Sequence, residues 1–178
     1  MSVLVDLEGR EEPVVNICPD GTQGKVVSIG DLPIQLPKVP TKKKILFHNL
    51  KKQDQYWKRQ ELPSDLALIS SMDEWSQTPD EFRKKYESYI KTEYERRRNG
   101  VWFYNNGEPT YISGHHYFFL QWSKIDVGYP SFLQFQQQLF LHMEACFRDP
   151  RCLGQVYTKC RRSGYTQMSS SLLVGEAT

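Results

Sequence analysis

The 178-residue chain lacks the features that mark membrane and secreted proteins. No uninterrupted apolar run approaches the roughly 18 residues that a membrane-spanning helix needs. The N-terminus also lacks the basic start and apolar stretch of a signal peptide. These absences predict a cytosolic protein with no membrane partner.

Cysteine is scarce, and its spacing is not that of a metal site. The sequence has no C-x-x-C pair and no histidine at zinc-finger spacing beside its four cysteines, Cys18, Cys146, Cys152 and Cys160. We therefore expect reduced thiols rather than a disulfide framework or a metal centre.

Net charge is also small, because 23 lysines and arginines face 21 acidic residues and leave a formal charge of +2. A charge this small does not by itself imply nucleic-acid binding. The positive charge is instead local, and it lies in short clusters at residues 42–44, 51–52, 96–98 and 161–162.

Three regions follow one another along the chain. Residues 1–50 have frequent prolines and only short apolar runs, which predicts an extended proline-rich arm with room for one hairpin, followed by a basic linker. Within it, Leu32–Pro40 suits polyproline-like geometry, either as a tether crossing a surface or as a plain linker. Residues 51–128 are expected to form a helical N-terminal subdomain with a hairpin, and residues 129–178 begin a third region.

The middle region contains the clearest helix of the sequence. A short helix is expected over Gln53–Glu61, and the longer one begins at Thr78-Pro79-Asp80-Glu81, a capping box with proline in the first turn, and ends at Asn99-Gly100. The arginines at 96–98 suit the end of the helix dipole first and a DNA contact second. Its apolar residues at helical spacing predict a buried stripe of Phe82, Tyr86, Tyr89, Ile90 and Tyr94.

A hairpin and an aromatic core helix follow. The strands Val101–Tyr104 and Thr110–Ile112 flank the turn pair Asn106-Gly107. Residues 117–122 are too aromatic on every side for a surface helix, so we expect them in the core. Adjacent histidines at 115 and 116 point in different directions on a helix, which disfavours a shared metal ion.

The third region reads as helix, strand, loop and helix. A helix is expected from Tyr129-Pro130 to about Phe147, because Asp149-Pro150 ends it. Gly154–Thr158 is then expected as a short buried strand, followed by a polar loop and a helix that starts near Thr166. The predicted fold class is therefore mixed α/β.

The polar loop has the parts that a phosphate chain needs. Backbone N–H groups at a helix N-terminus cradle phosphate oxygens, a lysine neutralises the β and γ phosphates, and a hydroxyl ligates Mg²⁺. Gly164 and Thr166 stand where a Walker A loop has them, but lysine stands first rather than seventh. The eight residues are Lys159-Cys160-Arg161-Arg162-Ser163-Gly164-Tyr165-Thr166.

This loop resembles the deviant Walker A loop of large terminase subunits from tailed phages, notably the lambda-like type, where a Lys-x-x-Arg-x-Gly-Tyr-Ser pattern occurs. The upstream stretch from Trp102 to Leu120 looks like terminases of crAss-like and related Bacteroidetes-infecting phages. The resemblance covers roughly residues 102–178, and residues 1–100 match no family. It implies that residues 129–178 hold the first strand, phosphate loop and helix of a P-loop ATPase sheet, truncated before the sheet is complete.

The resemblance also implies roles for the loop residues. Lys159 would bind phosphate, Thr166 would ligate Mg²⁺, and Gly164 would let the backbone approach ATP. Arg161 or Arg162 would be the catalytic arginine near the γ phosphate. Cys160, Ser163 and Tyr165 would complete the cofactor-binding loop. Gln136 is the best-placed candidate for the glutamine that reads adenine, and its competitors are Gln134, Gln137 and Gln138.

For the parent protein, the resemblance implies an ATPase and endonuclease that drives DNA translocation during viral genome packaging in the host cytoplasm. Its partners would be double-stranded DNA, the portal protein, the small terminase subunit and further copies in a homo-oligomeric ring. No strand ending in Asp-Glu and no nuclease acids follow Thr166, so we expect a fragment without hydrolase activity of its own. The rival hypotheses are a non-enzymatic protein-interaction module and a simple DNA-binding domain.

Overall fold

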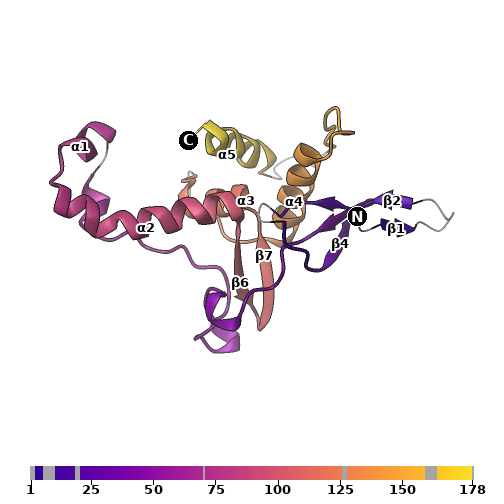
Figure 1. Ribbon diagram of the computed structural model, residues 1–178, viewed down its shortest axis with the longest axis horizontal. Helices are drawn as coiled ribbons and strands as arrows, with labels where there is room; N and C mark the ends of the chain where they lie inside the picture. Colours follow the sequence, from indigo (N-terminus) through magenta and orange to yellow (C-terminus); the bar gives the residue numbers. More distant parts are fainter. Residues whose placement is uncertain are drawn as a thin grey trace.

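The computed structural model describes residues 3–5, 11–18, 21–69, 71–125, 128–158 and 164–177. Over these residues the protein is a mixed α/β fold, as the sequence predicts, with helices around small sheets (Figure 1). Helix α1 and the first strands lie toward opposite ends of the longest axis. No sheet of the described residues has more than three strands, so the parallel sheet of a P-loop ATPase is not confirmed.

The first forty residues contain paired strands. The antiparallel pair is β1 (Val3–Val5) with β2 (Glu11–Pro13). A second sheet has β5 (Leu32–Gln35) at its centre, with β3 (Val15–Asn16) parallel to it on one side and β4 (Val26–Ile29) antiparallel on the other. The predicted extended arm is therefore wrong where these strands form, although the β4–β5 hairpin fits the one that the sequence allowed.

The expected tether at Leu32–Pro40 is wrong over its first half, because residues 33–37 are buried. Pro33 is tolerated in a central strand because β3 pairs with β5 only from Ile34 onward, so proline removes no hydrogen bond on that side. The burial of Ile34, with no exposed surface, explains why this segment follows strand rather than polyproline geometry.

Short 3-10 turns lead from the strands to the helices; they are η1 (Lys42–Lys44), η2 (Lys52–Asp54) and η3 (Leu66–Leu68). The helix expected over Gln53–Glu61 is wrong, because after η2 the chain forms no helix before η3. In this coil segment Trp57 is buried, whereas Tyr56 is exposed. The Trp57 ring makes edge contacts with three rings of the core, Phe47, Phe103 and Tyr117.

Helix α1 (Met72–Gln77) leads into the long helix α2 (Asp80–Asn99). The helix itself and its C-terminal end confirm the prediction, and Gly100 closes the helix with a φ of 72°. The capping box at its start is wrong. Thr78 donates its hydroxyl to the carbonyl oxygen of Trp75 at 2.6 Å, and so it caps the end of α1 instead.

The stripe expected on α2 is only partly buried. Tyr86 is buried, and Tyr94 is 57% exposed. The other three members, Phe82, Tyr89 and Ile90, are half-buried. An acidic residue that the pattern did not include, Glu93, is buried in their place.

The hairpin after α2 is confirmed. Strand β6 (Val101–Asn105) pairs with β7 (Glu108–Ile112), and Asn106 and Gly107 have φ angles of 49° and 88°, as a type I′ turn requires. Helix α3 (Gly114–Trp122) follows and lies in the core, as its aromatic composition predicts.

Two more helices complete the described chain, α4 (Gln134–Arg148) and α5 (Tyr165–Ala177). The end of α4 and the start of α5 agree with the prediction. Helix α4 begins later than Tyr129-Pro130, because an extended segment places Phe132 against core rings. The buried strand expected over Gly154–Thr158 is wrong: this segment is coil, and Val156 is 99% exposed because no described strand pairs with it.

Helix α4 contacts two hydrophobic clusters. Its residues Leu139, Phe140 and Met143 belong to the larger cluster, which α3, α5 and the β6–β7 hairpin complete. Leu141 and Ala145 belong to the smaller cluster, with Val15, Ile17, Ile34, Leu36 and Tyr111. The N-terminal strands are thus anchored to the helical part of the molecule through α4.

Candidate functional site

The phosphate loop predicted from the sequence is described only at its end. Gly164, Tyr165 and Thr166 lie at the start of α5. The positions outside the described residues are Lys159, Cys160, Arg161, Arg162 and Ser163. Whether these five contact a nucleotide therefore stays a prediction.

The described end of the loop is open and lies directly before α5. Gly164 has a φ of 73°, which glycine adopts readily, and the nearest atom to a Cβ built there is Gln167 Oε1 at 4.0 Å, so a ligand could approach the backbone. Thr166 is exposed in the first turn of α5, where helix N–H groups have no intrahelical partner. Tyr165 stacks on Tyr157, with ring centroids 4.7 Å apart. The backbone at Gly164 and the side chain of Thr166 are therefore accessible at the start of α5.

Gln136, the expected adenine reader, lies in the first turn of α4 and is 8% exposed. Its Oε1 has no hydrogen-bond partner within the described structure. The competing Gln137 donates from Nε2 to the carbonyl oxygen of Tyr111 at 2.6 Å. No hydrogen bond of the described residues brings Gln136 to Gly164 or Thr166, so its role in adenine binding remains a prediction.

A charged cleft of about 1180 Å³ lies between α2, α3, α4 and α5. Helix α5, which carries the end of the predicted loop, forms one wall of this cleft through its C-terminal half. Most of the polar side chains around it are charged: Lys91, Glu95, Arg97, Arg98, His115, Glu144, Arg148 and Glu176. The cleft therefore offers charges of both signs rather than one uniform patch.

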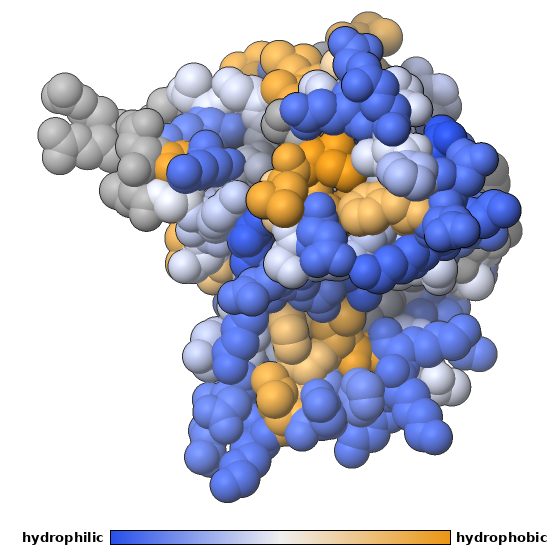
Figure 2. All heavy atoms as spheres, turned by 90° about the vertical axis from the view of Figure 1, so that its left-hand side faces the viewer, coloured by the Kyte–Doolittle hydropathy of each residue, from blue (hydrophilic) through white to orange (hydrophobic). Residues whose placement is uncertain are grey.

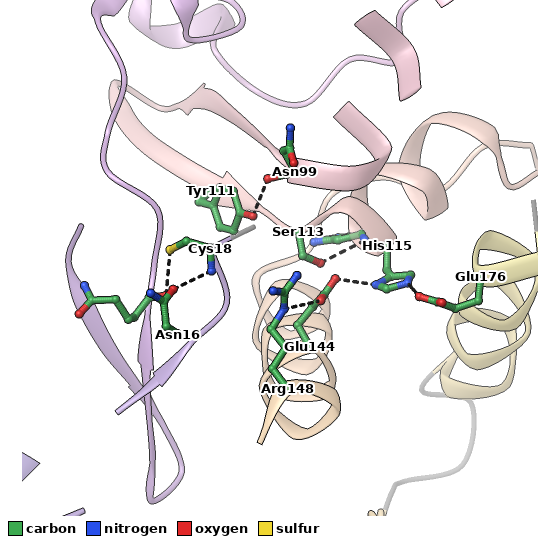
Figure 3. A network of polar contacts seen from close by, with 11 residues as sticks. Asn16, Cys18, Asn99, Tyr111, Ser113, His115, Glu144, Arg148 and Glu176 are labelled. Carbon is green, nitrogen blue, oxygen red and sulfur yellow. Dashed lines mark hydrogen bonds and ion pairs between the residues drawn. The ribbon is translucent and has the colours of Figure 1, made fainter. Parts of the chain in front are cut away.

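His115 lies between two carboxylates in this cleft (Figure 3). Its Nδ1 is 2.5 Å from Glu144 Oε1 on α4, and its Nε2 contacts Glu176 Oε1 on α5. An ionised carboxylate only accepts hydrogen bonds, so both ring nitrogens must donate, which requires the protonated ring. Burial alone lowers the pKa of His115, but the two glutamates outweigh it, and the pKa lies above its ordinary value.

No local pattern in the sequence indicates this trio. Glu144 and Glu176 are 29 and 61 residues from His115, and no periodic pattern connects such distant positions. The sequence pointed to the two adjacent histidines, but not to the glutamates that His115 contacts. The trio links α3, α4 and α5, and it therefore holds α5 against the other two helices.

His116 has a different environment, as the sequence predicts for adjacent helical positions. It is fully buried and stacks between Phe132 and Phe140, with ring centroids 5.7 and 4.8 Å away. Neither ring nitrogen has a hydrogen-bond partner in the described structure, and burial lowers the pKa to about 3. His116 is therefore neutral at neutral pH. Within the described ranges, no three or more His, Cys, Asp or Glu side chains are grouped closely enough to hold a metal ion.

Comparison of the chain with protein family models, with curated protein sequences and with solved structures finds no significant match. Among the residues that the structure describes, no helix is both long and apolar enough to cross a membrane. The candidate site therefore rests on the loop residues and on the geometry at the start of α5.

Proposed function

We propose that this chain supplies the N-terminal region and the phosphate loop of a genome-packaging ATPase of the large terminase type. The observation that carries the proposal is the left-handed, open Gly164 directly before α5, with Thr166 exposed in the first turn. A loop glycine followed by a helix and a hydroxyl is the arrangement by which P-loops bind phosphate.

In the proposed site, Lys159 neutralises the β and γ phosphates, and Thr166 gives its hydroxyl to Mg²⁺. Gly164 lets the backbone N–H groups approach the phosphates, and Arg161 or Arg162 stabilises charge on the γ phosphate. Bound ATP with Mg²⁺ would supply the phosphoryl group whose hydrolysis drives movement of DNA. The wider proposal, as the resemblance implies, is a parent protein that translocates and cuts double-stranded DNA as a ring on the portal, together with the small terminase subunit.

This chain is expected to bind ATP without turning it over. Phosphoryl transfer in P-loop enzymes needs an acidic residue for Mg²⁺ and for the attacking water. The residues that follow Thr166 in this sequence contain no Asp-Glu pair that could supply it. Steady ATP hydrolysis by the purified chain would contradict this part of the proposal.

The direct test is equilibrium binding of a fluorescent ATP analogue with Mg²⁺. We expect Lys159→Ala to weaken binding by about tenfold or more, since a charge-assisted hydrogen bond contributes roughly 1.5–3 kcal/mol. Lys42→Ala is the matched control and should bind like wild type, because Lys42 lies in η1, away from the loop in sequence. Equal affinity of all three proteins, or no binding by wild type, would overturn the proposal.

A protein-interaction module is the second candidate, and an apolar groove favours it. Figure 2 shows apolar side chains surrounded by hydrophilic ones on the face at the α1 end of the molecule. A groove of about 330 Å³ between α2, α3 and the chain from Leu62 to η3 is lined mainly by apolar residues, Leu62, Leu66, Tyr89, Ile90, Phe118 and Trp122. Under this function, Lys159→Ala would leave partner binding unchanged. Substitution of Leu66 by a charged residue would abolish partner binding.

A further inference from the structure

Two basic clusters that lie far apart in the sequence meet in a cleft that the predicted phosphate loop does not line. This cleft, of about 560 Å³, lies between the segment 37–46, the C-terminal half of α2 and the β6–β7 hairpin. Lys38, together with Lys43 and Lys44 of η1, lines it, and Arg96 lines it from the last turn of α2. We call it the lysine cleft.

The fold fixes the backbone that carries the lysines. Turn η1 is closed by a hydrogen bond from the Lys44 N–H to the Thr41 carbonyl oxygen at 2.8 Å. Ile45, the next residue, is 2% exposed and anchors the turn in the interior. The Leu46 N–H then donates to the Trp102 carbonyl oxygen at 2.9 Å, which ties the segment to β6. The lysines of η1 therefore extend from a backbone that is held in place.

The positive charge of the lysine cleft is not neutralised by nearby acids. The three lysines are exposed, and no ion pair among the described residues engages their ammonium groups. Glu95 is the one acidic side chain among the described residues that line the cleft. Arg96 contributes less free charge, because it donates to Glu93 and Gln60. The arginines at 96–98 offset the partial negative charge at the end of the α2 dipole.

Neutral and aromatic groups complete the lining. Thr92 and Asn99 are exposed on α2, and hydroxyl and amide groups of this kind contact the sugar–phosphate backbone of nucleic acids. The half-buried indole of Trp102 also lines the cleft. A basic groove with an aromatic ring beside it is the combination that binds single strands without sequence preference.

The size of the cleft favours one strand over two. A volume of about 560 Å³ corresponds to a cube roughly 8 Å on a side, which is narrower than the roughly 12 Å major groove of a DNA duplex alone. A single sugar–phosphate strand can therefore enter between the lysines and α2, whereas a duplex cannot.

We propose that the lysine cleft binds the backbone of a single-stranded nucleic acid, with Lys38, Lys43 and Lys44 contacting its phosphates. A lysine binds phosphate as a point charge and displaces a condensed counterion from the strand. Binding is therefore independent of base sequence and weakens as salt increases. The proposal shares no residue with the proposed nucleotide site.

The test is fluorescence anisotropy of a labelled oligothymidylate of about twelve nucleotides, a length within the usual range of single-strand sites. The full chain is titrated at several salt concentrations between about 50 and 200 mM. Three phosphate contacts predict that the logarithm of affinity falls with the logarithm of salt at a slope of about −2. Lys43→Ala and Lys44→Ala should each weaken binding about threefold to tenfold and make the slope shallower by about 0.7.

Lys84→Ala is the matched control. It removes the same charge from an exposed position on α2, but Lys84 does not line the cleft. Its affinity and salt slope should equal those of wild type. A loss as large as that of Lys43→Ala would mean that overall charge, rather than the cleft, attracts the strand.

The remaining outcomes also decide the proposal. Absence of binding at the lowest salt, an affinity independent of salt, or tighter binding of a duplex of equal length would overturn it. Equal competition by polyglutamate would assign the cleft to an acidic peptide instead. Lys43→Ala and Lys44→Ala should bind the fluorescent ATP analogue like wild type, so failure of either proposal is distinguishable from failure of the other.

Discussion

At the scale of single residues, the carboxylate of Glu93 is a buried acidic group that needs hydrogen-bond partners in the core. It is 6% exposed on α2, and a buried charge is destabilising unless it is paired and hydrogen-bonded. Tyr117 of α3 donates its hydroxyl to Glu93 Oε2 at 2.5 Å, and Arg96 donates to Oε1 at 2.6 Å. Arg96 also donates to Gln60 Oε1 at 2.7 Å, so the network joins α2, α3 and the extended segment before η3.

This network gives the first stability prediction. Tyr117→Phe keeps the ring but removes the hydroxyl, so one oxygen of a buried carboxylate loses its donor. We expect the free energy of unfolding to fall by about 1–3 kcal/mol. The measurement is urea denaturation followed by circular dichroism.

Tyr94→Phe is the control for the loss of a hydroxyl on the same pair of helices, because Tyr94 is exposed. It should change the unfolding free energy by less than about 0.5 kcal/mol. If the two variants are equally stable, the hydrogen bond between Tyr117 and Glu93 does not support the fold.

At the scale of elements, the sequence predicted best those helix ends and turns whose backbone conformation depends on the residues at that position. The C-terminal end of α2 and the turn of the β6–β7 hairpin depend on Gly100, Asn106 and Gly107, which adopt positive φ angles. The expected helix at 53–61 failed because Trp57 gains more by reaching the aromatic core from an extended chain. The expected strand at 154–158 failed because a strand needs a partner, and no local pattern supplies one.

Helix α5 is expected to loosen as the pH rises, because His115 links it to the other helices. A histidine whose folded pKa is raised stabilises the fold fully below its unfolded pKa, roughly 6.5. That contribution is lost as the pH rises through the higher folded pKa. We expect a loss on the order of 1 kcal/mol, kept small because Glu176 is 61% exposed and screened by solvent.

Hydrogen exchange of the α5 amides, measured on both sides of this pH window and corrected for intrinsic rates, checks the effect. Protection should fall at the higher pH in wild type. In His115→Gln the pH dependence should largely disappear, since glutamine cannot carry the charge. An unchanged pH dependence in His115→Gln would assign the loosening to another group.

At the scale of the whole molecule, the sequence predicted the mixed α/β class and the aromatic core, but not how the first forty residues join it. Prolines and short apolar runs indicated an arm, because each strand there is only two to four residues long and too short for a clear alternating pattern. Of the candidate site, only the loop at residues 159–166 could be predicted, because its residues are adjacent in the sequence. The partners of His115 depend on packing between elements, which spacing along the chain does not encode.

If the N-terminal strands are part of the fold rather than a tether, Ile34→Ala must destabilise the whole molecule. Ile34 has no exposed surface and lies in the cluster that Leu141 and Ala145 of α4 complete. Removal of such a side chain costs about 2–5 kcal/mol. We expect the fluorescence of the four tryptophans, among them Trp57 in the larger cluster and Trp102 beside the smaller one, to show unfolding at a lower urea concentration. Val39→Ala, at a residue 44% exposed, should unfold like wild type. Wild-type behaviour of Ile34→Ala would instead mean that α4 holds the helices together without the strands.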